Sequence, residues 1–221
     1  CGAGVALKLV QALGGIESAE QFFDLAAVAT IADLVPLLDE NRLIVQLGLK
    51  KLEEQRNLGL KLLIEEQKLT YPVLSGDIAY KIAPRINAAG RMGDAYRAFE
   101  LLTSTDTKYV QEIIAAINED NSKRKILCDK LYSEALEDLA HENLIDNRSV
   151  ILSNPEWEKG ITGILAARLA GDFHRPAFVM VSSGEYYKGT SRSVHGINIY
   201  DLLSSVSDIL VEFEGHSQAA G

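Results

Sequence analysis

A single carboxylate, Asp33, interrupts the apolar run ATIADLVPL. A carboxylate is costly to bury unless it is paired, hydrogen-bonded or bound to a metal ion. Carboxylate oxygens are also the ligands that hard divalent cations take in proteins. Asp33 is therefore a candidate metal ligand. A helix cap or a salt bridge is the alternative that spacing alone leaves open.

Two arginines, Arg85 and Arg91, flank Asn87 and three small residues in the segment PRINAAGR. Guanidinium groups bind phosphate in a bidentate fashion, and small residues let a ligand or another chain approach the backbone. The segment is a candidate phosphate-binding element. In the alternative interpretation, the two arginines pair with Asp77 and Asp94.

Hydroxyl groups, cations and a histidine gather in the last part of the chain. Together they have the chemistry of a phosphate-binding cradle, although a lone histidine is more often structural. The residues are Lys188, Thr190, Ser191, Arg192 and Ser193, with His216 after a glycine.

The remaining histidines and one acidic pair have weaker patterns. His141, His174 and His195 show no metal-ligand spacing with His216, so we assign them structural or surface positions. Glu156 and Glu158 flank a tryptophan and have side chains suited to acid–base chemistry, but a solvated loop is the favoured interpretation.

The stretch 106–143 is the element expected to position these groups. It contains no proline or glycine, Asp106 can cap its start, and apolar residues recur at helical spacing. The polar segment NEDNSKRK, residues 118–125, separates two apolar clusters, 110–117 and 127–139. We predict one long helix that bridges two bodies, with a polar middle that contacts little protein and leaves Lys123, Arg124 and Lys125 free for phosphate.

The rest of the chain divides into a helical part and an α/β part. Helices are predicted over 2–13, 17–30, 39–55 and 96–102. After the long helix, strands at 149–153, 177–181 and 185–192 alternate with helices at 161–171 and 199–211, which indicates a small α/β domain. The fold class is therefore α/β, with a mostly helical first part.

Composition restricts the class of protein. The 221 residues are 47% hydrophobic, carry a formal net charge of −9 and include two cysteines. This excludes a disulfide framework and a cysteine-based zinc site, and a reducing cytoplasm fits. No run of 18 apolar residues occurs. The negative charge argues against broad nonspecific adhesion to nucleic acid, but it allows a narrow basic groove.

Five motifs occur in a fixed order: ATIADLVPL, PRINAAGR, WEKGITGILAARL, KGTSRS and EGHSQAAG. In this order they resemble the RecJ family, single-strand-specific DNA exonucleases of the DHH phosphoesterase superfamily. The resemblance covers nearly the whole chain. It implies that 1–105 is the remainder of a DHH-type domain, that 106–143 is the connecting helix, and that 144–221 is the DHH-associated substrate-binding domain. The DHH motif itself is absent from these residues, and we expect it upstream of Cys1.

The resemblance also implies roles for the candidate residues. Asp33 corresponds to a ligand of a two-metal site that uses Mn²⁺ or Mg²⁺. Substrate-binding roles fall on Arg85, Asn87, Arg91, Thr190, Arg192 and His216. Two positions depart from the family pattern, because Thr190 replaces a serine and Glu214 replaces the first of two glycines before the histidine.

The implied activity is 5′-to-3′ hydrolysis of single-stranded DNA in repair and recombination, in the cytoplasm. We expect this chain alone to be inactive and monomeric, with a single-strand-binding protein or a helicase as further partners and no membrane association. Two alternatives stay open: a DHH-family phosphodiesterase for cyclic dinucleotides or short oligonucleotides, and a noncatalytic RecJ-like binding module.

Overall fold

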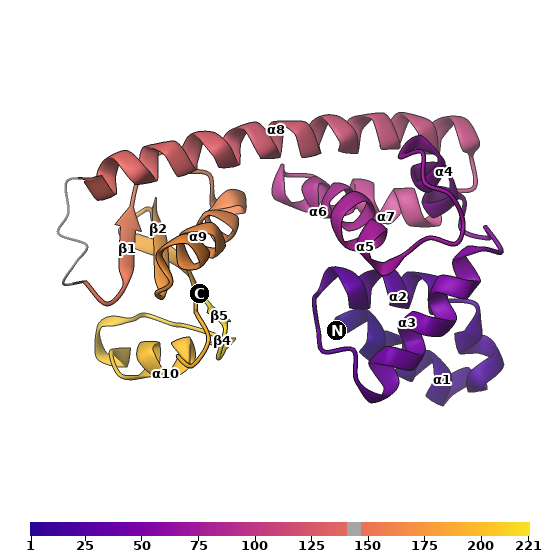
Figure 1. The fold of residues 1–221 in the computed structure, drawn as a ribbon, viewed down its shortest axis with the longest axis horizontal. Coiled ribbons are helices and arrows are strands. Elements are labelled where there is room, and N and C mark those ends of the chain that lie inside the picture. Colours follow the sequence, from indigo (N-terminus) through magenta and orange to yellow (C-terminus); the bar gives the residue numbers. More distant parts are fainter. Residues whose placement is uncertain (141–146) are drawn as a thin grey trace. The chain divides into compact units, whose positions relative to one another are not determined.

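The computed structural model describes residues 1–140 and 147–221, and its internal contacts divide the chain into two units. Unit 1 is Cys1–Ser122 and unit 2 is Lys123–Gly221. Among the described residues, every strand belongs to unit 2, and unit 1 is helical (Figure 1). The predicted α/β class with a mostly helical first part is therefore confirmed. The three-part assignment 1–105, 106–143 and 144–221 stays a prediction, and His141 lies outside the described residues.

Unit 1 consists of short helices packed around one apolar core. That core includes Ile31 from the second helix and Ile117 from the eighth. The elements are α1 (Gly2–Glu20), α2 (Phe23–Ala32), α3 (Asp39–Leu52), α4 (Leu58–Glu66), α5 (Ser75–Asp77), the π-helix η1 (Ile78–Ile82), α6 (Ala83–Arg91), α7 (Tyr96–Thr103) and the first part of α8 (Thr107–Ala140).

The boundary between the first two helices differs from the prediction. The sequence predicts helices over 2–13 and 17–30, whereas α1 continues to Glu20 and α2 begins at Phe23. Gly15 produces a kink inside α1, with φ 77° and ψ 176°. The Ser18 hydroxyl donates to the Gly14 carbonyl, 2.7 Å away, so this residue stabilises the kink from inside the helix.

The second and third helices approach each other closely. At Gly48 in α3, an added Cβ atom would lie 2.1 Å from the Phe23 carbonyl oxygen and 2.3 Å from the Ala27 Cβ. Only a residue without a side chain fits there, so the backbones of α2 and α3 pack directly against each other. This contact fixes α2, whose C-terminal end carries Asp33.

A buried acid in the first turn of α2 makes stability depend on pH. Asp24 is 4% exposed, and its Oδ1 accepts from the Leu25 amide at 2.7 Å. Burial raises the pKa of the Asp24 carboxyl above its ordinary value, and this effect outweighs the opposing influence of Lys51. A carboxyl whose pKa is raised by folding penalises the folded state as it ionises, so the penalty grows as pH rises through the aspartate range.

We therefore expect Asp24→Asn to be more stable than the wild type at pH 7, because the amide keeps the oxygen that accepts from Leu25 and carries no charge. The difference should disappear as pH falls below the ordinary aspartate range, where the wild-type carboxyl is neutral. Urea denaturation at several pH values measures it, with the exposed Asp208→Asn as control. An advantage that does not change with pH would contradict the explanation.

The long helix α8 is continuous from Thr107 to Ala140, which confirms the prediction of a single helix through the polar middle. Asp106 caps it, since its Oδ1 accepts from the Lys108 and Tyr109 amides at 2.9 and 3.2 Å. The apolar residues from Val110 to Ile117 join the core of unit 1. In unit 2, Leu131 and Leu139 are buried, and Trp157 Nε1 donates to Glu134 Oε2 at 2.9 Å.

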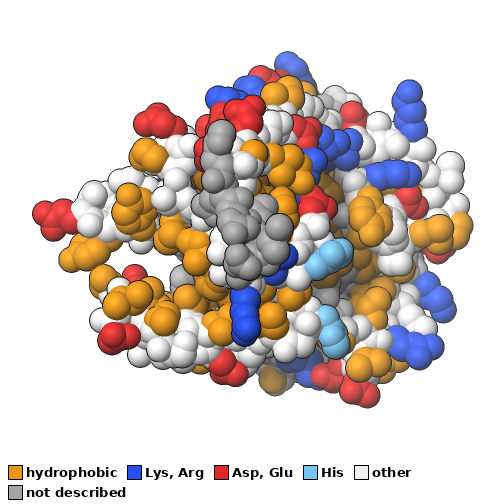
Figure 2. Space-filling view, turned by 60° about the vertical axis from the view of Figure 1, so that its left-hand side comes forward, with side chains coloured by type: hydrophobic (Ala, Val, Ile, Leu, Met, Phe, Trp, Pro, Cys, Tyr) orange, Lys and Arg blue, Asp and Glu red, His pale blue; other side chains and the backbone are white. Residues whose placement is uncertain are grey.

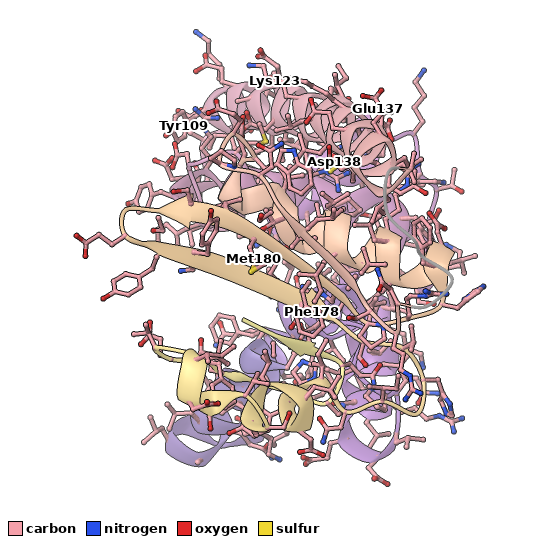
Figure 3. The ribbon with its side chains drawn as sticks, turned by 90° about the vertical axis from the view of Figure 1, so that its left-hand side faces the viewer. Tyr109, Lys123, Glu137, Asp138, Phe178 and Met180 are labelled. Atoms are coloured by element: carbon pink, nitrogen blue, oxygen red, sulfur yellow. The ribbon has the colours of Figure 1, made fainter. Side chains whose placement is uncertain are left out.

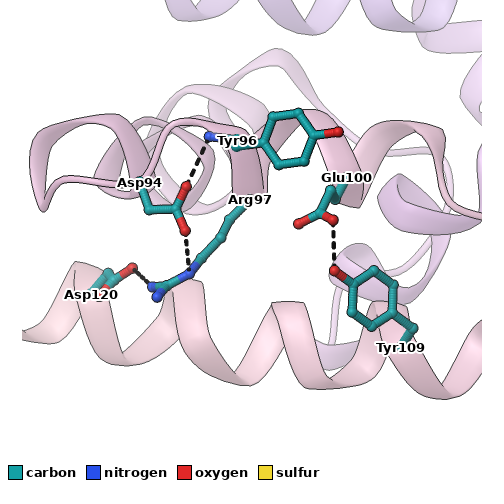
Figure 4. Close-up of polar contacts among 6 residues, drawn as sticks. All are labelled: Asp94, Tyr96, Arg97, Glu100, Tyr109 and Asp120. Atoms are coloured by element: carbon teal, nitrogen blue, oxygen red, sulfur yellow. Dashed lines mark hydrogen bonds and ion pairs between the residues drawn. The ribbon is translucent and has the colours of Figure 1, made fainter.

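The prediction that the polar middle of α8 contacts little protein is wrong for its first half. Asp120 and Asn121 are buried, 9% and 3% exposed. Arg97 of α7 donates to Asp120 at 2.8 Å and also pairs with Asp94, as Figure 4 shows. Position 121 lies seven residues after Ile114 and four after Ile117, so the inward-facing stripe of α8 continues into its polar middle. Of the three basic residues, Lys123 and Lys125 are exposed and Arg124 is half-buried.

Unit 2 is a small mixed sheet with helices. Its strands have the order β1-β2-β3-β5-β4, in which β1 is parallel to β2 and the other pairs are antiparallel. The elements are β1 (Val150–Ser153), α9 (Lys159–Phe173), β2 (Ala177–Ser183), β3 (Tyr186–Arg192), α10 (Ile199–Ser204), the 3₁₀ turn η2 (Ser207–Ile209), β4 (Gly215–His216) and β5 (Ala219–Ala220). The predicted helix over 199–211 is too long, because α10 ends at Ser204.

The two faces of this sheet differ. Val150, Leu152, Ala177 and Val179 are buried and share one face through the register of β1 and β2. The opposite face carries Phe178 and Met180, which are half-buried (Figure 3). Because directly opposed residues share a face, the pairing of Ala177 with Arg192 and of Val179 with Thr190 places both β3 residues on the buried face.

Candidate nucleic-acid interface

Thr190 and Arg192 form a joined pair on β3, two residues apart and therefore on the same face of the strand. Arg192 Nη1 donates to the Thr190 hydroxyl at 3.3 Å and to the Ser191 carbonyl at 2.8 Å. Both side chains are half-buried. These contacts restrain the guanidinium group before any ligand arrives, which lowers the conformational cost of binding phosphate.

The helix α9 passes directly beside this pair at Gly163. A Cβ atom added to Gly163 would lie 3.2 Å from Arg192 Nη2 and 3.6 Å from the Thr190 hydroxyl. A glycine therefore lets the guanidinium group lie against the helix. Gly163 is not among the residues predicted for the cradle, and its place in the motif GITGIL is the signal that links it to the cradle.

His216 lies in one cross-strand row with Arg192. Arg192 of β3 pairs with Ala219 of β5, and Ala219 pairs with His216 of β4. Directly opposed residues point to the same side, so Arg192 and His216 share a face two strands apart, roughly 10 Å between backbones. His216 is exposed, and its Nδ1 accepts from the Gln218 amide at 3.3 Å. Because Nδ1 accepts this bond, Nε2 is the ring nitrogen left to donate to a ligand.

The backbone before His216 requires a glycine at position 215 and accommodates a glutamate at position 214. Gly215 has φ 151°, and an added Cβ would meet Ala219 and Ala220 atoms at 2.5 Å. Glu214 is not among the residues with positive φ, and its backbone exchanges two hydrogen bonds of 2.9 Å with Gly221. Glu214 is also exposed. Replacing the family's first glycine therefore leaves the strand pairing of this loop intact.

In unit 1, the helix α6 separates the two arginines of PRINAAGR. Arg85 is half-buried, and its Nε donates to Asn118 Oδ1 of α8 at 2.8 Å. Burial lowers the pKa of the Arg85 guanidinium from its ordinary value, which still leaves it charged at neutral pH. Asn87 and Arg91 are exposed and lie one turn apart, roughly on the side opposite Arg85. Helical spacing therefore places Asn87 and Arg91 on a similar side of α6, away from Arg85.

Each of the two acidic residues proposed as alternative partners has a basic partner within one helical turn. Asp77 pairs with Lys81 at 2.8 Å, and Asp94 pairs with Arg97 at 3.1 Å. The strongest influence on the Asp77 carboxyl is its hydrogen bond with Lys81, which lowers its pKa. The hydrogen bond from Arg85 to Asn118 connects α6 to α8.

Asp33 terminates α2 and is exposed. Its backbone amide donates to Ala29, and its carboxylate has no hydrogen bond or ion pair among the described residues. A cavity of about 330 Å³ adjoins this helix end, lined by Ile31, Leu34 and Tyr80 among others, but Asp33 is not in its lining. Within unit 1, Asp33 therefore lines no such cavity and forms no salt bridge, and its role as a metal ligand stays a prediction.

The described residues do not form a metal site by themselves. Over 1–140 and 147–221, no group of three or more His, Cys, Asp or Glu side chains could hold an ion. His174 and His195 are exposed, as are Glu156 and Glu158, which agrees with surface positions. Across the same described residues, no helix has the length and apolar character to cross a bilayer.

Comparisons with known proteins agree with this arrangement. Residues 146–221 match the DHHA1 domain model. Over its whole length the chain is 41% identical to the single-stranded-DNA-specific exonuclease RecJ of Bacillus subtilis, covering 28% of that protein, and 36% identical to RecJ of Thermus thermophilus, covering 32%. The Escherichia coli enzyme is 29% identical over 93% of this chain, which covers 37% of the enzyme.

Solved structures match as well. The Mg²⁺ complex of Thermus thermophilus RecJ superposes on 91% of this chain with a TM-score of 0.82 and 34% identity, and the chain covers 31% of it. A manganese-bound exonuclease RecJ gives a TM-score of 0.72 at 35% identity, over 91% of this chain and 50% of that one. The resemblance inferred from the five motifs is therefore confirmed: the chain carries a DHHA1 domain and corresponds along its length to a part of RecJ.

Proposed function

We propose that this chain is the substrate-binding part, with one metal ligand, of a nuclease that hydrolyses single-stranded DNA from its 5′ end in repair and recombination. The observation that carries the proposal is the row formed by Thr190, Arg192 and His216 on one face of the DHHA1 sheet. A hydroxyl, a restrained guanidinium and an imidazole lie there on one face of the sheet. Each can donate a hydrogen bond to a phosphate oxygen.

The chemistry of each group supports this assignment. Arg192 supplies a permanent positive charge and Thr190 orients it, while His216 offers a ring nitrogen that can donate a hydrogen bond. Asn87 and Arg91 offer a second polar surface on α6. These residues bind and orient a phosphate backbone, and none of them needs to break a bond.

The bond-breaking step requires more than the described residues provide. The solved relatives are complexes with Mg²⁺ or Mn²⁺, whereas the described residues here do not fit a complete metal site. We propose that Asp33 contributes one carboxylate and that the other ligands come from polypeptide outside these 221 residues. The ions would supply an activated water and charge stabilisation. On this proposal the isolated chain binds DNA without cutting it.

The distribution of charge limits which residues can provide affinity for DNA. Figure 2 shows basic and acidic side chains interspersed over the face that it displays, consistent with the net charge of −9. A broad basic surface is therefore not the source of affinity. We propose that a few basic side chains at fixed positions provide the affinity for DNA. The affinity should therefore fall with salt concentration as expected for only a few phosphate contacts. Cytoplasmic location, and partners such as a single-strand-binding protein, belong to the same proposal.

We expect Arg192→Ala to weaken binding of a 5′-phosphorylated single strand by about tenfold to a hundredfold, because charge-assisted hydrogen bonds to phosphate are lost. Fluorescence anisotropy with the 221-residue chain measures the affinity. Arg148→Ala removes an equal charge from an exposed position and serves as the control. Equal affinities for the two variants would show that the row does not bind phosphate.

Cleavage products separate the exonuclease from the other functions. A protein that carries this chain together with its upstream region should shorten a long single strand stepwise in Mn²⁺ buffer and leave a duplex uncut. Preferential hydrolysis of a cyclic dinucleotide would favour the small-substrate phosphodiesterase. Binding without cleavage of any substrate would favour a noncatalytic module.

A further inference from the structure

The phosphate row continues along β3 toward the hairpin end of the sheet. Alternate residues of a strand share a face, so Arg192 and Thr190 are followed on the same side by Lys188 and Tyr186. The register agrees, because Lys188 pairs with Val181 and Tyr186 pairs with Ser183, in the same alternation that pairs Thr190 with Val179. We call these four residues, Arg192, Thr190, Lys188 and Tyr186, the β3 row.

Exposure increases along the β3 row. Arg192 and Thr190 are half-buried beside α9, whereas Lys188 is exposed and Tyr186 is 61% exposed. The hairpin that carries Tyr186 is tight. Gly184 has φ 68° at the first position of a two-residue loop, as a type II′ turn requires. The tyrosine therefore lies on a backbone paired with β2 and not on a loop, and Figure 3 shows this hairpin with Met180 labelled on β2.

A further cation is held beside the same end of the row. Lys159, the first residue of α9, donates from Nζ to the Ser183 hydroxyl at 3.1 Å, and Ser183 is the residue directly opposite Tyr186. The exposed acids Glu158 and Glu185 also lie near this end, at the start of α9 and in the turn. Arg192, Lys188 and Lys159 thus provide spaced positive charges, and an exposed aromatic ring stands at the far end.

We infer that Tyr186 is a base-stacking residue for single-stranded nucleic acid whose terminal phosphate is held by Arg192 and Thr190. This inference rests on the proposed function and adds to it a second contact point. Phosphate-binding cations with an aromatic side chain form the usual surface for single strands, because every base offers a flat face. The spacing fits, since six strand positions separate Arg192 and Tyr186, roughly 20 Å. At about 3.4 Å per stacked nucleotide, that distance spans about six nucleotides.

The neighbouring residue Tyr187 is a matched control. It is 64% exposed, belongs to the same strand, and points to the opposite face. Substituting either tyrosine removes the same aromatic area from the same hairpin. Only Tyr186 lies on the β3 row, so only its loss should affect a strand bound along that row.

The test compares Tyr186→Ala, Tyr187→Ala and Arg192→Ala in the 221-residue chain, with 5′-phosphorylated oligothymidylates of two and twelve nucleotides. We expect Tyr186→Ala to weaken binding of the 12-mer by about fivefold to a hundredfold and to leave dinucleotide binding unchanged. Tyr186→Phe should retain the 12-mer affinity because the ring is preserved. Tyr187→Ala should resemble the wild type with both lengths.

The outcomes separate this inference from the proposed function. If Arg192→Ala weakens both oligonucleotides but Tyr186→Ala changes neither, the stacking residue is wrong and the phosphate row stands. If both tyrosine variants lose affinity equally, the strand does not follow the β3 row, and the inference fails. If Arg192→Ala itself has no effect, the proposed phosphate site fails. Circular dichroism of each variant verifies that the hairpin change has not unfolded unit 2.

Discussion

Asp33→Ala should lower the turnover of single-stranded DNA by orders of magnitude in a protein that carries this chain and its upstream region. On the proposed function, the change removes a carboxylate ligand from a divalent metal site, and hard ions have few other ligands to replace it. The fold should be nearly unaffected, because Asp33 is exposed and its carboxylate has no hydrogen bond among the described residues. Exposed changes of this kind usually alter stability by less than about 0.5 kcal/mol.

Three measurements test the prediction for Asp33→Ala. Initial rates on a labelled single strand in Mn²⁺ buffer give turnover, thermal unfolding gives stability, and binding without metal gives DNA affinity. DNA affinity should persist, since the β3 row is unchanged. Asp138→Ala removes another exposed carboxylate, from α8, and should leave turnover at the wild-type level. Near-normal cleavage by Asp33→Ala would remove Asp33 from the metal site.

The second large effect is expected on the stability of unit 1. Gly48→Ala should destabilise unit 1 by about 3 kcal/mol or more, at the upper end of what overpacking costs. The added Cβ would meet the Phe23 carbonyl oxygen at 2.1 Å, and a backbone atom of a packed helix cannot rotate away as a side chain can. The helices α2 and α3 would have to move apart, and Asp33 at the end of α2 would move with them.

Gly90→Ala is the matched control in the same unit. Its added Cβ would lie 3.7 Å from the Ala95 Cβ, an ordinary contact, so the gain in helix propensity should make it neutral or stabilising by up to about 1 kcal/mol. Urea denaturation followed by far-ultraviolet circular dichroism reports on the helices, most of which belong to unit 1. The single tryptophan, Trp157, reports on unit 2 by fluorescence. Equal midpoints for Gly48→Ala and the wild type would mean that the α2–α3 contact is looser than described.

Local patterns in the sequence were enough to predict most elements. The apolar repeat of α8 and its cap at Asp106 depend only on residues within one or two turns of each other, and so do the alternating strands of unit 2. The pairing of Thr190 with Arg192 is equally local, because two positions along a strand always share a face. The ordered motifs supplied the resemblance to RecJ, and the residues that carry it need no tertiary information to be recognised.

Only the tertiary structure decided which polar residues meet. The sequence of PRINAAGR suggested one group with two arginines, but α6 directs Arg85 to Asn118 and leaves Arg91 on another side. His216 joins Arg192 because two short strands place Ala219 between them, a register that no local pattern specifies. In the middle of α8, polar side chains that hydropathy assigns to solvent are buried against arginines of α6 and α7. The physical reason is that periodicity identifies a face, whereas the partner of that face depends on which distant residues can satisfy its charges and hydrogen bonds.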